Sequence, residues 1–216
     1  MTVAFDPATM GAGKWTLSNG NLTAVAAGRS AGIWESGKSN VKLPASSKVY
    51  YEGAIQVVGS NPAGVMWGFT STNATGDNTF PGDATNTGIG IALLASSGNL
   101  QYFVNGSSTT LSVPLTPGTS AWLGLCINTG TGGVWVTKDG TNWNVSGSGA
   151  NPATNTGPIV VTPLNGVQSY VAIGAYATGD KGTWNPGSSA FAFSVPAGFT
   201  ALNSFFPPAS GLWFNH

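Results

Sequence analysis

The chain has 216 residues, of which 41% are hydrophobic, so it is long enough to bury one sizeable core and too apolar to be disordered throughout. Seven basic and seven acidic residues leave a formal net charge of zero. The basic residues are scattered along the chain, which argues against nucleic acid, acidic polymers and anionic membranes as partners.

The ends of the chain and its single cysteine suggest no export signal and no disulfide. Residues 1–7 lack a basic and apolar leader, and no stretch approaches about 18 uninterrupted apolar residues. We therefore expect a soluble protein without a cleaved signal peptide or a transmembrane segment. Cys126 lies in the apolar run 122–127 and is predicted to be a buried small hydrophobe.

Gly or Pro interrupts nearly every window of a dozen residues, which disfavours helices, whereas short runs rich in Val, Ile, Tyr, Phe and Trp recur between polar turns. Strands are predicted at 14–17, 21–26, 31–34, 48–58, 64–70, 88–94, 99–104, 109–113, 121–128, 132–137, 159–161, 169–176 and 190–194. The segments 89–94, 122–127 and 170–176 have small or apolar residues on both faces, so we place them centrally in their sheets. Asn19-Gly20, Asn105-Gly106 and similar pairs predict antiparallel hairpins.

Residues 48–58 alternate clearly. One face, predicted to be core, carries Val49, Tyr51, Ile55 and Val57, and the other carries Tyr50, Glu52, Ala54 and Gln56. Glu52 is accordingly predicted to be a solvated surface carboxylate, and we interpret Glu35 in the same way.

Residues 1–203 are predicted to form one domain, because no linker divides them, and residues 204–216 form an aromatic tail. Two interpretations of the tail remain open: it docks on another protein, or it covers the core of its own domain. Its candidate docking residues are Phe205, Phe206, Leu212, Trp213 and Phe214.

Catalytic chemistry has few candidate residues. A nucleophile–histidine arrangement would have to use His216, the last residue, and a glycosidase pair would have to use Glu35 and Glu52. One Cys and one His do not make a usual zinc site, and no Gly-rich loop carries the Lys-Ser/Thr of a phosphate-binding loop. We predict no enzyme, no cofactor and no metal; a calcium ion on Asp77, Asn78 and Asp83 is the weaker alternative to plain loop solvation.

Aromatic and polar loop residues remain as candidates for ligand binding. Trp143 and Trp184 lie in Gly/Asn-rich turns, where an exposed indole could stack on a sugar, although packing under a loop is the competing interpretation. Trp67, Trp122 and Trp135 lie in strand patterns and are assigned to the core. The long polar loops 71–87 and 146–158 add Asp77, Asn78, Asp83, Asn86 and Asn155 as candidate ligand-binding residues.

Several segments resemble the SPRY family in their order along residues 10–203. They are the hairpin at 120–144, the closing segment 170–203 with Pro196-Ala-Gly-Phe199, and the upstream strands Lys14 to Thr23, Tyr50 to Ile55 and Val65 to Phe69. The resemblance implies an all-β, antiparallel two-sheet sandwich of the concanavalin A-like, jelly-roll type, and non-enzymatic recognition through loops. The chain departs from the family at Pro186 and in its two long loops.

Low charge and Ser/Thr/Asn/Gly-rich loops resemble the SPRY-type modules of bacteriophage structural proteins. That resemblance implies a protein on the virion surface, as a fibre, tail or capsid-attached component, which binds a host-surface glycan or a neighbouring virion subunit. A decoration protein without a ligand is the alternative, and a glycan-cleaving enzyme on the same fold is a third. We expect a homo-oligomer in contact with other virion proteins, and neither nucleic acid nor membrane insertion.

Overall fold

The computed structural model describes residues 2–28, 33–56, 64–71, 76–77, 79–85, 88–94, 99–114, 120–144, 149–160 and 169–207. These residues form strands and two short 3₁₀ helices, without an α-helix among them. The strands are β1 (Trp15–Ser18), β2 (Thr23–Ala26), β3 (Glu35–Lys42), β4 (Lys48–Gln56), β5 (Val65–Ser71), β6 (Gly76–Asp77), β7 (Gly88–Leu94), β8 (Asn99–Val104), β9 (Ser107–Pro114), β10 (Ser120–Asn128), β11 (Gly133–Thr137), β12 (Ile159–Val160), β13 (Ser169–Ala175), β14 (Lys181–Asn185) and β15 (Thr200–Ala201). The 3₁₀ helices are η1 (Pro7–Thr9) and η2 (Leu202–Phe205).

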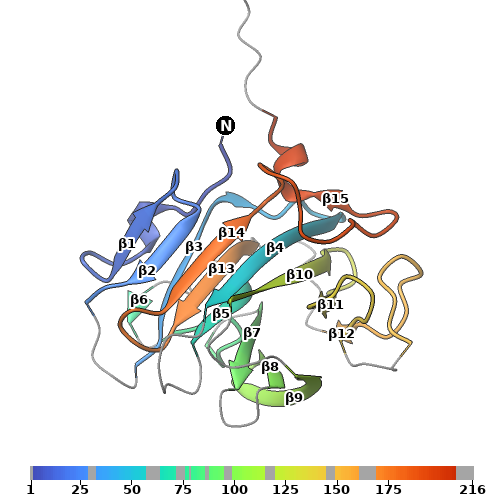
Figure 1. The fold of residues 1–216 in the computed structure, drawn as a ribbon, viewed down its shortest axis with the longest axis horizontal. Coiled ribbons are helices and arrows are strands. Elements are labelled where there is room, and N and C mark those ends of the chain that lie inside the picture. Colours follow the sequence, from blue (N-terminus) through green and yellow to red (C-terminus); the bar gives the residue numbers. More distant parts are fainter. Residues whose placement is uncertain are drawn as a thin grey trace, which may run out of the picture.

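The strands form two sheets packed face to face, as the sequence predicts (Figure 1). The eight-stranded sheet has the order β1-β2-β14-β4-β10-β11-β12, with β15 beside β4, and the seven-stranded sheet has the order β6-β3-β13-β5-β7-β8-β9. All pairs are antiparallel except β15 with β4. The fold is therefore an antiparallel two-sheet sandwich, in which β7, β10 and β13 are interior strands as predicted.

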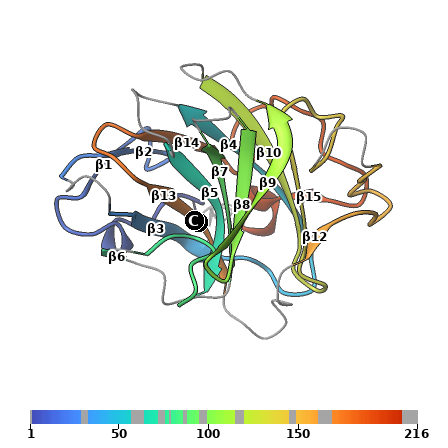
Figure 2. The same ribbon diagram turned by 90° about the horizontal axis from the view of Figure 1, so that it is seen from below.

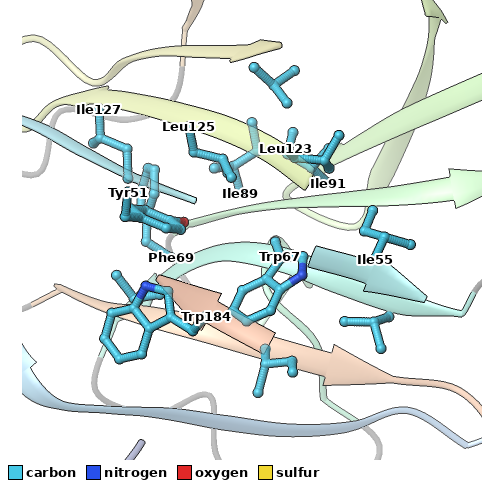
Figure 3. Close-up of a cluster of buried hydrophobic side chains, with 14 of the residues drawn as sticks. Tyr51, Ile55, Trp67, Phe69, Ile89, Ile91, Leu123, Leu125, Ile127 and Trp184 are labelled. Atoms are coloured by element: carbon cyan, nitrogen blue, oxygen red, sulfur yellow. The ribbon is translucent and has the colours of Figure 1, made fainter. Parts of the chain in front are cut away.

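The core between the sheets is aromatic and aliphatic (Figure 3). Tyr51 and Ile55 from β4 meet Trp67 and Phe69 from β5, and all four are fully buried. The Tyr51 hydroxyl donates to the Gly68 carbonyl at 2.8 Å, and Trp67 Nε1 donates to the Ala54 carbonyl at 3.0 Å. These two bonds join the sheets at one point and satisfy the polar atoms of buried aromatic residues.

A close approach between the sheets depends on glycine at position 53 of β4. A Cβ added there would lie 2.5 Å from Trp67 Cδ2, and therefore any larger residue would displace the indole. Glycine at this position therefore leaves the space that the Trp67 ring occupies.

The turns at Asn19-Gly20 and Asn105-Gly106 close tight hairpins as predicted, with all four residues at positive φ. Asp139-Gly140 opens a longer connection between β11 and β12 instead. The predicted pair Asn165-Gly166 lies outside the described residues.

Two predicted strands are wrong, and four observed strands were not expected: β3, β6, β14 and β15. Ile33 and Trp34 precede a strand, which is β3, and the segment 190–194 has no strand pairing. Strands β3 and β14 are rich in Lys, Ser, Asn and Gly, residues that strand propensity disfavours. Each is paired on both sides, so the sheet context overrides local propensity.

Membrane-spanning helices are not found: none of the helices in the described part of the chain is long and apolar enough to cross a bilayer.

Candidate functional site

Trp143 and Trp184, the two tryptophans considered as candidates to stack on a ligand, are buried, so neither offers an exposed indole. Trp184 lies on β14 in the core, with its ring 5.3 Å from that of Phe5. Trp143 packs with Tyr50, Cys126, Trp135 and Phe199 on the outer face of the eight-stranded sheet. The competing interpretation, packing under a loop, is therefore closer for both indoles, although Trp184 packs into the core from a strand and not from a loop.

The two glutamates are also buried rather than solvated. Glu52 is inaccessible to solvent and accepts hydrogen bonds from the Tyr50 hydroxyl at 2.8 Å, Ala192 N at 2.8 Å and Phe193 N at 2.9 Å. Glu35 is 2% exposed and pairs with Lys14, with Nζ 3.3 Å from Oε1. They belong to different sheets, so they do not form a glycosidase-type pair facing one cleft.

The remaining polar candidates lie on opposite sides of the molecule. Asp77 lies on β6 opposite Glu35 of β3, and half-buried Asp83 accepts a hydrogen bond from Thr85 N at 3.0 Å. Asn155 is exposed beside the β10–β11 turn, where Asn128 Nδ2 donates to its side-chain oxygen at 3.4 Å. The segment around Asn155 and strand β6 lie at opposite ends of the molecule in both views (Figure 2). The structure therefore does not bring the two polar loops into one site; Asn78 and Asn86 lie outside the described residues.

Phe205 and Phe206, the first two residues of the predicted docking set, pack against the core of their own domain and are half-buried. This contact favours the covering role for that part of the tail. Leu212, Trp213 and Phe214 lie outside the described residues, so their docking role remains a prediction.

The structure assembles an aromatic cluster that the sequence did not reveal. It consists of Trp34 before β3, Phe80 after β6, Phe103 on β8 and Tyr176 after β13, all half-buried. The Trp34 ring lies 5.4 Å from Phe80 and 5.3 Å from Tyr176, and Phe80 lies 5.6 Å from Phe103. Four segments distant in sequence thus present a continuous row of rings at the seven-stranded sheet.

Small residues in the seven-stranded sheet allow the cluster to lie close to it. A Cβ at Gly174 would lie 3.2 Å from Pro81 Cδ and 3.5 Å from Trp34 Cε3, and one at Gly90 would overlap the Pro81 carbonyl. The segment 79–82 therefore rests directly on the sheet backbone.

Hydrogen bonds fix the segments that hold the rings. The hydroxyls of Ser36 and Thr79 lie 2.9 Å apart and join β3 to the segment before Phe80, while Gly106 N donates to the Gly82 carbonyl at 2.8 Å. Asp180 Oδ2 accepts from Tyr176 N at 3.1 Å and from Ala177 N at 2.8 Å, which shapes the turn that carries Tyr176. The rings are therefore held in place before any ligand arrives.

The cluster is uncharged, whereas the shifted ionisable groups lie elsewhere. Burial, together with the hydrogen bond to Glu52, raises the pKa of Tyr50 far above its usual value, and burial raises the pKa of Cys126. Among the described residues, no group of three or more His, Cys, Asp or Glu side chains is placed to hold a metal ion. The geometry suits contact with an uncharged molecule that has an apolar face.

Solved structures with this fold include SPRY domains. The chain superposes on the TRIM65 PSpry domain with a TM-score of 0.55 at 15% identity, covering 85% of this chain and 92% of that one. It superposes on the SPRY domain of human HERC1 with a TM-score of 0.56 at 15% identity, covering 87% and 100%. Stonustoxin gives a TM-score of 0.56 at 15% identity over 85% of this chain, which spans only 28% of the toxin chain.

No family model and no curated protein matches the sequence. The fold is therefore that of a SPRY-like, concanavalin A-like sandwich, defined by structure alone.

Proposed function

We propose that this chain is a non-enzymatic binding module that recognises a neutral glycan through the aromatic cluster of Trp34, Phe80, Phe103 and Tyr176. The observation that carries the proposal is the row of half-buried rings, each partly accessible to solvent, on an otherwise tightly packed sandwich. Aromatic faces stack on the C–H faces of sugar rings and bury apolar surface without needing charge.

The arrangement of the acidic residues supports binding over catalysis. Glu52 is committed to two backbone N–H groups and a tyrosine hydroxyl, and Glu35 forms an ion pair with Lys14. A hydrolase acting at the aromatic cluster would need two carboxyl groups facing the same sugar. Asp180, the acidic residue that shapes the Tyr176 turn, accepts backbone hydrogen bonds and is fully buried.

We place this module on the surface of a bacteriophage particle, with a host-surface glycan as its ligand. This part of the proposal rests on the resemblance of the low charge and polar loops to phage SPRY-type modules. The alternative is a decoration protein of the virion that binds no ligand. In that case the aromatic cluster would have no binding partner.

The test is a glycan array probed with the labelled full chain, followed by titration of any glycan that binds. Trp34→Ala should weaken binding at least tenfold, because it removes one of the two inner rings of the row. Trp122→Ala is the matched control, since Trp122 is also a half-buried tryptophan but lies on β10 of the other sheet, and it should leave affinity unchanged.

Absence of binding across the array would reject the glycan as ligand. Binding that survives Trp34→Ala but fails in Trp122→Ala would instead move the site to the other sheet.

A further inference from the structure

Strand β9 is an open edge of the seven-stranded sheet. In the part of the chain that the structure describes, it pairs with β8 and with no other strand, and it lies at the rim of the molecule (Figure 1). Its residues Ser107 to Thr110 are four consecutive exposed positions, so both faces of the strand are in contact with solvent. An edge of this kind offers a row of unpaired backbone groups to another strand.

Residues 107–110 of this edge lack the usual protection against pairing, whereas beyond Thr110 the register of β9 against β8 is irregular. Natural edge strands are kept apart by charged side chains, by proline, by β-bulges or by being short. Strand β9 has eight residues with its proline at the last position, and no charged residue occurs anywhere between Asp83 and Lys138. The opposite case is β1, the edge of the eight-stranded sheet, which has four residues and follows Lys14 directly.

The register of the β8–β9 hairpin shows which backbone groups face outward. The two-residue turn Asn105-Gly106 places Val104 and Ser107 in the hydrogen-bonded pair next to the turn, so pairs alternate from there. Tyr102 with Thr109 is then a hydrogen-bonded pair, and the N–H and C=O groups of Ser108 and Thr110 point away from β8.

We propose that two copies of this chain pair through β9, antiparallel, about a two-fold axis at Thr109. Ser108 of each copy then exchanges backbone hydrogen bonds with Thr110 of the other, and the two Thr109 residues face each other as a non-hydrogen-bonded pair. A two-fold axis places a strand against itself, so any charge would meet its own sign; β9 carries none. Its exposed β-branched threonines also suit cross-strand pairing.

Disulfide trapping tests the predicted register. In a non-hydrogen-bonded antiparallel pair the Cα atoms lie about 4.5 Å apart, within the range of about 4.4–6.8 Å that a disulfide spans. Thr109→Cys should therefore form a covalent dimer on oxidation, visible on a non-reducing gel. The native Cys126 is fully buried and does not compete. Thr16→Cys, exposed on β1, is the matched control and should stay monomeric.

Sedimentation of the unmodified full chain should show a species of twice the monomer mass of 21.8 kDa. Thr109→Lys should raise the dimer dissociation constant at least tenfold, because two like charges then face each other, whereas Thr16→Lys adds the same charge without effect. A monomer at all concentrations, as expected if β9 accepts a strand from a different protein, would overturn the proposal. So would a dimer indifferent to Thr109→Lys.

Discussion

The two outer faces of the sandwich both carry aromatic residues, but these residues differ in how deeply they are buried. On the eight-stranded sheet, Tyr50, Cys126 and Trp135 are fully buried beneath Trp143, Phe191 and Phe199. On the seven-stranded sheet, Trp34, Phe80, Phe103 and Tyr176 are only half-buried. The buried Glu52 anchors the cover of the first face, whereas the second is held by a short segment around Phe80. Segments are anchored on both faces, so the extent to which the rings are covered, rather than aromatic content, separates scaffold from candidate site.

The largest expected effect comes from a tryptophan that the sequence assigned to binding. Trp184→Ala should lower the free energy of unfolding by about 3–5 kcal/mol, because it empties a fully packed position in the core. Trp34→Ala should lower the free energy of unfolding by only about 1–2 kcal/mol, since that indole is half-buried. Urea unfolding of both variants measures the difference. Equal losses would mean that the two tryptophans play the same structural role.

The next largest effect is expected for Glu52→Gln. It should lower the free energy of unfolding by about 1.5–3 kcal/mol, because three hydrogen-bond donors in a buried site lose their charged acceptor. The amide protons of Ala192 and Phe193 should exchange faster with deuterium as the C-terminal cover loosens. Asp83→Asn, which alters a half-buried carboxylate of the other face, is the control for urea unfolding and exchange. Unchanged exchange at residues 192–193 would contradict the anchoring role.

Gly90→Ala should lower the free energy of unfolding by about 1–2 kcal/mol, because the added Cβ would overlap the Pro81 carbonyl and Met66 Sδ. It should also change the near-ultraviolet circular dichroism of the aromatic residues. The displaced segment carries Phe80, so binding of any glycan that the array identifies should fall as well. Thr85→Ala, exposed in the same loop, leaves the packing unchanged and is the control. Full affinity in Gly90→Ala would show that ring placement is unimportant.

The smallest effect is a pH dependence at the turn that precedes Trp143. Partial burial opposes ionisation of Asp139, but hydrogen bonds from Asn142, Thr141 and Thr137 outweigh it and lower its pKa to about 2. The folded pKa is depressed, so this contribution to stability is present above pH of about 4 and is lost as the pH falls toward 2. Asp139→Asn should lower the free energy of unfolding at neutral pH by less than about 1 kcal/mol, because the carboxylate is exposed. The free energy of unfolding of this variant should also depend less on pH between about pH 4 and pH 2. Thermal unfolding of the unmodified protein and of Asp139→Asn from pH 7 to pH 2 measures this difference. Parallel curves for the two proteins would contradict the stabilising role of Asp139.

Much of the fold was predictable from the sequence because period-2 patterns and turn pairs report on neighbouring residues. The predicted bounds 88–94 and 99–104 match β7 and β8. Strand β3 was not predicted, because pairing with β13 and β6 stabilises it as a strand although its own Lys and Ser residues do not favour one. Glu52 was placed in solvent because alternation identifies an opposite face without showing that a distant segment covers it.

The candidate site was less predictable because its members meet only in the folded protein. Trp34, Phe80, Phe103 and Tyr176 lie in four segments, brought together by the pairing of β13 with β3 and of β7 with β8. Composition of a turn does not show whether a neighbouring segment covers it, and so Trp143 was assigned to binding although it is buried. The polar loop 71–87 was chosen for its polar residues, whereas its contribution to the candidate site comes from Phe80 and Pro81, which were not chosen.

The unusual charge distribution has a consequence for how unfolding of this protein is probed. No lysine or arginine lies between Lys48 and Lys138, a span that includes most of β4 and all of β5 to β11. Trypsin therefore has no cleavage site in this span even when the chain is unfolded. The resistance of this span to trypsin would thus reflect the sequence and not the stability of the fold. Proteases that cut at aromatic or aliphatic residues have sites throughout the same strands, so they are the enzymes that measure how often this half of the sandwich opens.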